Sequence, residues 1–270
     1  MLALLRARSR PVGVVAIAAL AYGCAASTRP DTQSREDVLA RVLPSAVQIV
    51  LENPEGRRFR TGSGVIIAAR PSGAGSTSAA ECFVLTSGHT VTGAAGQKAI
   101  YLLFGRQQGA GTKASAVVVA HRETADVDVA LLRAESRDCV PARPAGAPRL
   151  GEPVWVLAFP WGRSMVLAGG IVSQVQGDDV SRFMVDASVS YGSSGGGVYD
   201  AGSGGLIGLV EGYRTARVTS QGSESPWYID VPMPGHTLVT PLADIKRFLA
   251  DTGHGDLIDG APSTPRSAAR

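Results

Sequence analysis

The sequence predicts an all-β protein, built as a sandwich or a barrel. Short apolar runs recur along the chain, and 33 glycines and 16 prolines among 270 residues supply the turns between them. Only two segments have helical periodicity. With 44% hydrophobic and 18% charged residues, the composition excludes a disordered chain, and the length suits one large domain or two small ones.

The β-rich runs are predicted as strands Ala46–Leu51, Gly64–Ala68, Cys82–Thr86, Ala99–Phe104, Ala116–Ala120, Val127–Leu132, Val154–Ala158, Ile171–Val175, Phe183–Val185 and Leu206–Val210. A short helix is expected over 35–43. A second helix, Pro241–Thr252, places its apolar residues Leu242, Ile245, Phe248 and Leu249 on one face. Residues 136–151 carry three prolines and are predicted to connect two halves of the domain. Residues 253–270 are predicted to form a disordered tail.

The charges are unevenly placed along the chain. The net charge is +3, from 26 basic and 23 acidic residues, and Arg6, Arg8 and Arg10 have no acidic neighbour in the first ten residues. Without these three arginines the remaining chain is neutral. The basic pI therefore does not indicate a nucleic-acid partner.

The N-terminus has the pattern of an export signal. An apolar run, Val12–Ala21, follows the arginines and is too short to span a bilayer, which needs about 20 residues. Tyr22-Gly23-Cys24 resembles a bacterial lipobox, although Tyr22 replaces the usual small residue. This implies a signal peptide over 1–23, a lipid on Cys24 and a tether over 24–34, with a plain cleaved signal or an uncleaved anchor as alternatives.

The remaining cysteines, Cys82 and Cys139, either pair in a disulfide or stay as buried thiols, because spacing alone cannot place them. No CxxC or HExxH motif occurs, and His121-Arg-Glu123 lacks the PCxxC partner of a zinc deaminase. No metal site and no cofactor are therefore predicted.

The sharpest local motif is Tyr191-Gly-Ser-Ser-Gly-Gly-Gly197. Glycines around Ser194 permit a tight turn and free amide N–H groups to stabilise an oxyanion. A glycine-serine linker has a similar composition, but strand-like segments flank this one. An α/β-hydrolase elbow is disfavoured, because a helix would have to start within three consecutive glycines at about 1 kcal/mol each.

Two upstream residues complete a candidate for nucleophilic catalysis. His89 directly follows an apolar strand, and Asp128 lies at the start of another. Serine is a weak nucleophile until an imidazole accepts its proton, and a carboxylate must fix the imidazole tautomer. Asp126 is the alternative acid.

These blocks resemble the trypsin-fold serine proteases of the HtrA/DegP-like branch. VLTSGHTV resembles the histidine block, DVALL the aspartate block and VDASVSYGSSGGGVYD the serine block, while VWVLAFPWG, GGIVSQV and TPLADIKRFL resemble segments of the second barrel. The resemblance covers about 35–252. It implies two six-stranded antiparallel β-barrels with a short C-terminal helix and a cleft between the barrels.

The resemblance also implies residue roles. His89 would be the general base, Asp128 its orienting partner, Ser194 the nucleophile, and the N–H groups of Gly192 and Ser194 the oxyanion hole. Ser193 replaces the usual Asn or Asp and carries no charge to receive a new N-terminal ammonium. The oxyanion loop is therefore expected to be ordered by packing, by neighbouring loops or by a bound substrate or partner, without a zymogen cut. Ala158 replaces the glycine usual before the Phe-Pro turn, and the residues beyond 252 are too few for a PDZ module.

The expected function is that of an exported serine endopeptidase acting on proteins or peptides through an acyl-enzyme. The alternative is a binding module that keeps the fold without turnover. Substrate contacts are expected from Ser188, Val210, Glu211 and Gly212. Because Ser188 stands where trypsins carry an aspartate, cleavage after small or medium apolar residues is predicted, with Glu211 as the competing determinant of basic specificity. Ala25 after Cys24 favours an outer-membrane lipoprotein facing the periplasm.

Overall fold

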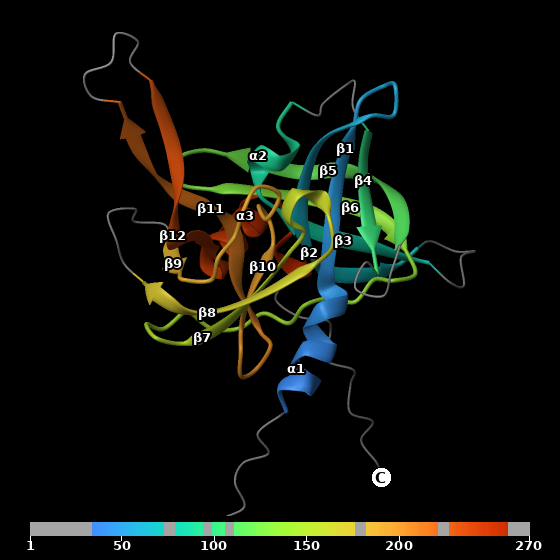
Figure 1. The fold of residues 1–270 in the computed structure, drawn as a ribbon. Coiled ribbons are helices and arrows are strands. Elements are labelled where there is room, and N and C mark those ends of the chain that lie inside the picture. The colour runs from blue at the N-terminus through green and yellow to red at the C-terminus, as the bar shows by residue number, and fades with distance from the viewer. Residues whose placement is uncertain are drawn as a thin grey trace, which may run out of the picture. The chain divides into compact units, whose positions relative to one another are not determined.

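Strands make up most of the regular secondary structure described in this computed structural model, which confirms the predicted all-β class (Figure 1). The structure describes residues 34–72, 79–93, 99–105, 111–175, 182–220 and 227–258, all within one unit, Gln33–Arg270. The predicted signal peptide and Cys24 lie outside the described residues. Among the described residues, no helix is long and apolar enough to cross a membrane.

The first six strands close into an antiparallel barrel. A helix, α1 (Arg35–Val42), and a 3-10 turn, η1 (Leu43–Ser45), lead into it. The strand order is β1-β2-β3-β6-β5-β4, and α2 (Gly88–Val91) follows β3. The strands are β1 (Ala46–Glu52), β2 (Arg58–Pro71), β3 (Ala80–Thr86), β4 (Ala99–Phe104), β5 (Thr112–Glu123) and β6 (Asp128–Ser136).

The last six strands close into a second antiparallel barrel, in the order β10-β11-β12-β9-β8-β7. They are β7 (Pro153–Ala158), β8 (Val166–Gln174), β9 (Phe183–Val185), β10 (Gly197–Asp200), β11 (Leu206–Thr219) and β12 (Tyr228–Pro241). A 3-10 turn, η3 (Pro160–Gly162), follows β7, and α3 (Leu242–Asp251) follows β12. The two six-stranded barrels confirm the expected fold.

The apolar runs are continuous because both faces of the central strands are buried. In β3, Cys82 and Val84 belong to the core of the first barrel, while Phe83 and Leu85 pack in a cluster between the barrels. In β7, Val154 faces the core of the second barrel and Leu157 the shared cluster. Successive residues of a strand point to opposite faces, so the apolar runs of β3 and β7 each fill two cores. The runs of β5 and β8 differ, because Val117 and Ile171 are exposed.

The helix α3 packs its apolar face on the cluster between the two barrels, and this helix was predicted from the sequence. Leu242, Ile245, Phe248 and Leu249 are all buried there. The predicted disordered tail, 253–270, is wrong for its first residues, because Gly255–Leu257 form a 3-10 turn (η4) and Leu257 and Ile258 are buried in the same cluster. The rest of that predicted tail lies outside the described residues. Two apolar side chains beside the end of α3 are enough to keep this segment packed.

Two strands and one helix differ from the sequence prediction. The strand β10 starts within the glycine run and β12 contains Pro232, Pro234 and Gly235, residues that disfavour strands. Both segments are strands because they pair with β11, and these backbone hydrogen bonds outweigh their low local strand propensity. The four-residue helix α2 was not predicted, because one helical turn is too short to show periodicity.

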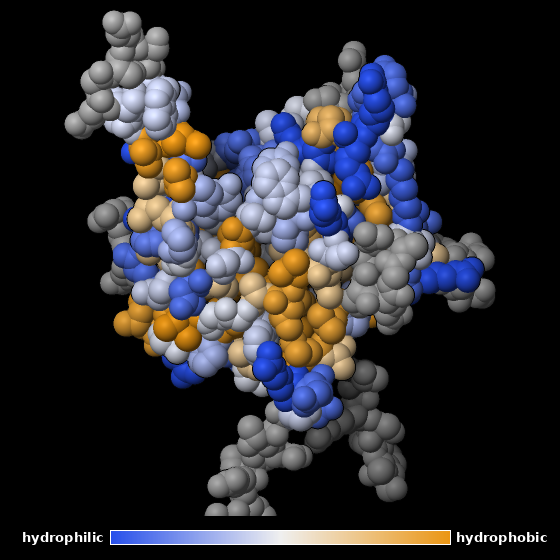
Figure 2. All heavy atoms as spheres, viewed as in Figure 1, coloured by the Kyte–Doolittle hydropathy of each residue, from blue (hydrophilic) through white to orange (hydrophobic). Residues whose placement is uncertain are grey.

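The strands β11 and β12 extend beyond the barrel as a two-stranded arm (Figure 1). Val218 lies opposite Ile229 and Ala216 opposite Val231, so these residues share one face, and apolar side chains are visible on the arm in Figure 2. The other face carries the two-point ion pair of Arg217 and Asp230, with Nε–Oδ1 at 2.8 Å. The arm is thus amphipathic.

The structure places the two cysteines beside each other. Cys82 in β3 and Cys139, just after β6, form a disulfide with their Cα atoms 5.7 Å apart. The segment after β6 sets this proximity by running along β2: Sγ of Cys139 lies 3.7 Å from the carbonyl of Ala68, and the next residue, Ala69, lies opposite Cys82 in the register.

Candidate active site

His89 lies in α2, directly after β3. Arg60 of β2 fixes this turn by donating hydrogen bonds from Nη1 to the carbonyls of His89 and Thr92, each at 2.9 Å. A Cβ at Gly88 would lie 2.5 Å from the carbonyl of Arg122 and 2.8 Å from Oδ1 of Asp128. Only glycine therefore allows α2 to pack this closely on β5 and β6.

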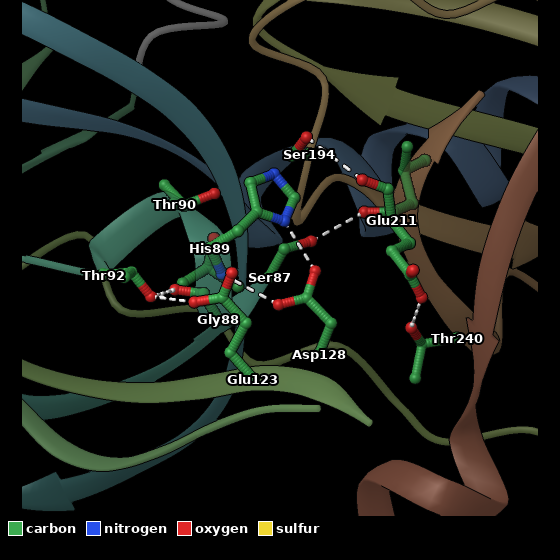
Figure 3. A network of polar contacts seen from close by, with 12 residues as sticks. Ser87, Gly88, His89, Thr90, Thr92, Glu123, Asp128, Ser194, Glu211 and Thr240 are labelled. Atoms are coloured by element: carbon green, nitrogen blue, oxygen red, sulfur yellow. Dashed lines mark hydrogen bonds and ion pairs between the residues drawn. The ribbon is translucent and has the colours of Figure 1, made fainter. Parts of the chain in front are cut away.

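Asp128 binds His89 at two points (Figure 3). Its Oδ2 is 2.6 Å from Nδ1 of the ring, and its Oδ1 accepts the backbone N–H of His89 at 2.8 Å. Asp128 is buried, whereas Asp126 is exposed in the loop before β6. Of the two acids considered from the sequence, the structure brings Asp128 to the histidine.

The pKa of His89 is raised above its ordinary value of 6.5. The hydrogen bond to Asp128 is the largest cause, burial of the ring opposes it, and the charges of Asp128, Glu123 and Glu211 raise the pKa further. Because the folded pKa is raised, the protonated ring stabilises the fold below pH 6.5, and this stabilisation is lost as the pH rises through the folded value.

Ser194 lies in the loop between β9 and β10, with its side chain near the His89 ring (Figure 3). Its hydroxyl donates to the carbonyl of Glu211 at 3.2 Å. Among the described residues, no hydrogen bond joins this hydroxyl to the ring. Catalytic hydrogen bonds are often long in unliganded enzymes and tighten with substrate, so the arrangement is compatible with an acid–base pair.

Two peptide units near Ser194 are oriented by their carbonyls. The carbonyl of Tyr191 accepts the N–H of Trp161 at 2.7 Å, and the carbonyl of Ser193 accepts the N–H of Gly196 at 2.9 Å. In a trans peptide the C=O and N–H point in opposite directions. The N–H groups of Gly192 and Ser194 therefore face away from these partners, and within the described part of the chain neither has an acceptor.

These residues share one cleft, with a volume of about 390 Å³. Its lining includes Arg60, Thr61, His89, Tyr191, Gly192 and Ser194. An acid–base pair, a hydroxyl and two free amides thus meet at one cavity, which is the set needed for acyl transfer through an oxyanion.

The predicted substrate-contact residues have different environments. Val210 is buried, and its carbonyl accepts the N–H of Gly195 at 2.7 Å and the Ser87 hydroxyl at 3.0 Å, so its role is structural. Gly212 borders open space, with no atom within 4 Å of an added Cβ, and Ser188 is exposed.

The carboxylate of Glu211 is already paired. Its Oε2 lies 2.6 Å from Nε of Arg182 and accepts the Thr240 hydroxyl at 3.1 Å. Arg182 also donates from Nη1 to the carbonyl of Ala125 in the first barrel at 2.6 Å. The sequence did not indicate Arg182, because an arginine before a short strand resembles any surface charge.

The sequence pattern of the trypsin-like peptidase domain matches residues 62–209, which span β2 to β11 and include His89, Asp128 and Ser194. The chain belongs to this family. The fold is similar to the crystal structure of the serine endoprotease from Yersinia pestis, with a TM-score of 0.59 and 19% sequence identity. The match covers 82% of this chain and 66% of that one. No curated protein matches the sequence.

We expect Glu123→Gln to lower the pKa of His89, because it removes a negative charge that raises it. Asp128→Asn should lower the pKa further, since it removes both the charge and the main hydrogen bond. An NMR titration of the histidine ring protons would measure both shifts. Glu135→Gln, on an exposed position of β6, is the matched control and should leave the His89 midpoint unchanged. An unchanged midpoint in Asp128→Asn would contradict the assignment of Asp128 as partner.

Proposed function

We propose that the protein is a serine endopeptidase that cleaves peptide bonds through an acyl-enzyme. One observation supports this most: Asp128 fixes His89 at two points, and in the same cleft the N–H groups of Gly192 and Ser194 have no acceptor among the described residues. Membership of the trypsin-like peptidase family makes proteins or peptides the substrates.

In this mechanism, Nε2 of His89 accepts the proton of the Ser194 hydroxyl as Oγ attacks the scissile carbonyl. The N–H groups of Gly192 and Ser194 bind the oxyanion. The protonated ring, stabilised by Asp128, then donates its proton to the leaving amine, and a water molecule activated by His89 hydrolyses the acyl-enzyme.

Substrate binding supplies the missing contact between Ser194 and His89. The pairing of β11 with β10 ends at Leu209. The carbonyl of Glu211 lies beyond this end, so β10 does not occupy it. An extended substrate chain alongside β11 can donate its N–H to this carbonyl, as in strand addition. The Ser194 hydroxyl is then released from Glu211 and can donate to the ring.

The substrate side chain that precedes the cleaved bond is proposed to be small or medium and apolar. Ser188 provides no charge, and the Glu211 carboxylate is neutralised by Arg182. A lysine or arginine of the substrate would have to displace a largely buried ion pair, which is strongly unfavourable.

The alternative is a binding module without turnover. The resting hydrogen bond from Ser194 to Glu211, in place of one to His89, is the observation that favours it. Labelling of Ser194, described below, separates the two functions.

Export with a lipid on Cys24 and location at the outer membrane, facing the periplasm, complete the proposal. The lipobox-like segment supports it, and the disulfide of Cys82 and Cys139 supports an oxidising compartment, since such bonds are rare in the cytosol.

Residues 35–270 carrying an arbitrary N-terminal tag should react with a fluorophosphonate at Ser194 and hydrolyse peptides without internal cleavage. Ser194→Ala and His89→Ala should each abolish turnover, and Asp128→Asn should lower kcat by roughly 10⁴ through the wrong imidazole tautomer. The exposed Asp126→Asn is the matched control and should retain activity. Labelling that requires a nick with a defined new terminus would contradict the resting geometry.

Arg182→Gln should increase cleavage after lysine and arginine, because it releases the charge of Glu211 towards the cleft. A peptide library digested by both forms would show the change. The double variant Arg182→Gln with Glu211→Gln is the control and should not gain basic specificity. Dominant cleavage after basic residues by the unmodified protein would refute the role of this ion pair.

Expressed from its own signal in a two-membrane bacterium, the protein should begin at a lipidated Cys24. Mass spectrometry of the mature N-terminus measures this directly, and Cys24→Ala should abolish the lipid mass. An unmodified terminus at Ala25 or later would rule out the lipoprotein.

A further inference from the structure

We infer that Ser63, a residue of the first barrel, positions the oxyanion hole of the second. The inference rests on the proposed function, since it concerns the geometry of the same site. Ser63 does not line the cleft and is fully buried in β2. It therefore acts through other groups, as a positioning residue.

The hydroxyl of Ser63 joins two loops of the second barrel. Its Oγ donates to the carbonyl of Gly192 and accepts the N–H of Phe159, both at 2.8 Å. A hydroxyl can donate once and accept twice, so one small side chain satisfies both buried groups. No aliphatic side chain can replace it without leaving a buried donor and a buried acceptor unpaired.

Both peptide planes beside Gly192 depend on this hydroxyl. Ser63 binds the carbonyl that follows the Gly192 Cα, and so fixes the peptide that joins Gly192 to Ser193. The preceding peptide is fixed by the N–H of Trp161, which belongs to the same short segment as Phe159. Ser63 thus restrains the N–H of Gly192 from both sides, together with the hydrogen bond that the N–H of Ser193 donates to the carbonyl of Ser190 at 3.0 Å.

Gly192 needs such external restraints. Its φ of +89° is in the region that favours glycine, and a Cβ there would lie 2.8 Å from the nitrogen of Trp161. Glycine has no side chain to limit rotation of its flanking peptides. Packing against the Phe159–Gly162 turn and the hydrogen bond from Ser63 restrict this rotation instead.

The turn itself is held by the first barrel. Trp161 has a φ of +56°, which is strained for a residue with a side chain, and the next residue, Gly162, accepts hydrogen bonds from Gln48 at 2.6 Å and Arg58 at 3.2 Å. These two bonds anchor the end of the turn, and Ser63 anchors its beginning at Phe159. The turn can therefore present the N–H of Trp161 to Tyr191.

The backbone of Ser63 has a separate role. Its N–H donates to the carbonyl of Ser194 at 2.8 Å, and its carbonyl accepts the Thr86 hydroxyl at 2.8 Å. Removal of the side-chain oxygen leaves both bonds possible. Loss of the hydroxyl should therefore disturb the oxyanion hole while the nucleophile and the His89–Asp128 pair stay in place.

The test compares Ser63→Ala with Ser45→Ala. Ser45 is also fully buried and its hydroxyl also makes two hydrogen bonds, to the carbonyl of Val42 and to the Tyr199 hydroxyl, at 2.7 and 2.8 Å. Both variants lose a buried hydroxyl with two partners, and only Ser63 touches the oxyanion loop. The measurements are kcat, KM, the pH profile, and the affinity for a peptide aldehyde, whose adduct places an oxyanion in the hole.

We expect Ser63→Ala to lower kcat by about 10- to 100-fold, with KM within about threefold. Aldehyde affinity should fall by the same factor as kcat/KM, and the acidic midpoint of the pH profile should not move. Ser45→Ala should retain kcat even if its melting temperature falls. Equal kcat in both variants, or a loss of kcat without a loss of aldehyde affinity, would overturn the inference.

A second variant and a measurement of amide hydrogen exchange test Ser63 independently of the folding of Ser63→Ala and of turnover. Ser63→Cys, which replaces the hydroxyl by a thiol that is only a weak donor, gives the same comparison if Ser63→Ala does not fold. Amide hydrogen exchange over 190–196 should increase in the Ser63 variants and not in Ser45→Ala, including in a Ser194→Ala background. This readout tests Ser63 even where the unmodified protein fails to label, which would be a failure of the proposed function alone; unchanged exchange would refute the role of Ser63.

Discussion

The loop that carries Ser194 is bonded to both barrels at once, and the site depends on these bonds. The carbonyl of Ser194 accepts the N–H of Ser63 in β2, and the N–H of Gly195 donates to Val210 in β11. A Cβ at Gly195 would lie 2.2 Å from both the Ser63 carbonyl and Oγ1 of Thr86. The two barrels can approach this closely only because glycine follows Ser194.

These contacts form a seam between the two barrels, and each barrel supplies different groups of the site along it. The first barrel contributes the His89–Asp128 pair, and the second contributes Ser194, the proposed nucleophile, and the free amides. Each closed barrel satisfies its own strand edges, so the contacts between them are made by loops, side chains and the shared apolar cluster. The hydroxyl of Ser87, which donates to Val210, and the guanidinium of Arg182, which donates to Ala125, cross the same seam in opposite directions.

Most of the fold could be predicted because its strands contain apolar runs, several of them buried on both faces, and are separated by glycine and proline. The three candidate catalytic residues could be proposed because their chemistry limits them to a few residue types. Ser63 could not, since the predicted second strand began at Gly64, one residue too late. Thr61-Gly-Ser-Gly64 has little strand propensity, yet a Cβ at Gly62 would lie 2.5 Å from Cγ2 of Thr90, so close packing favours glycine there. Hydrogen bonds between residues far apart in the chain leave no periodic pattern.

Trp161 gives the molecule an optical reporter beside the loop that carries Ser194. Its indole is 64% exposed and lies 5.3 Å from the ring of Tyr191, centroid to centroid, while its backbone N–H binds the peptide that orients Gly192. Rotation of that peptide must move the tryptophan, its tyrosine neighbour, or both. The sequence has three tryptophans, and of the other two Trp155 packs under Arg35 and Trp227 lies on the arm. With phenylalanine at those two positions, the emission of a single natural tryptophan would follow the loop around Gly192 in real time, without a label attached to Ser194.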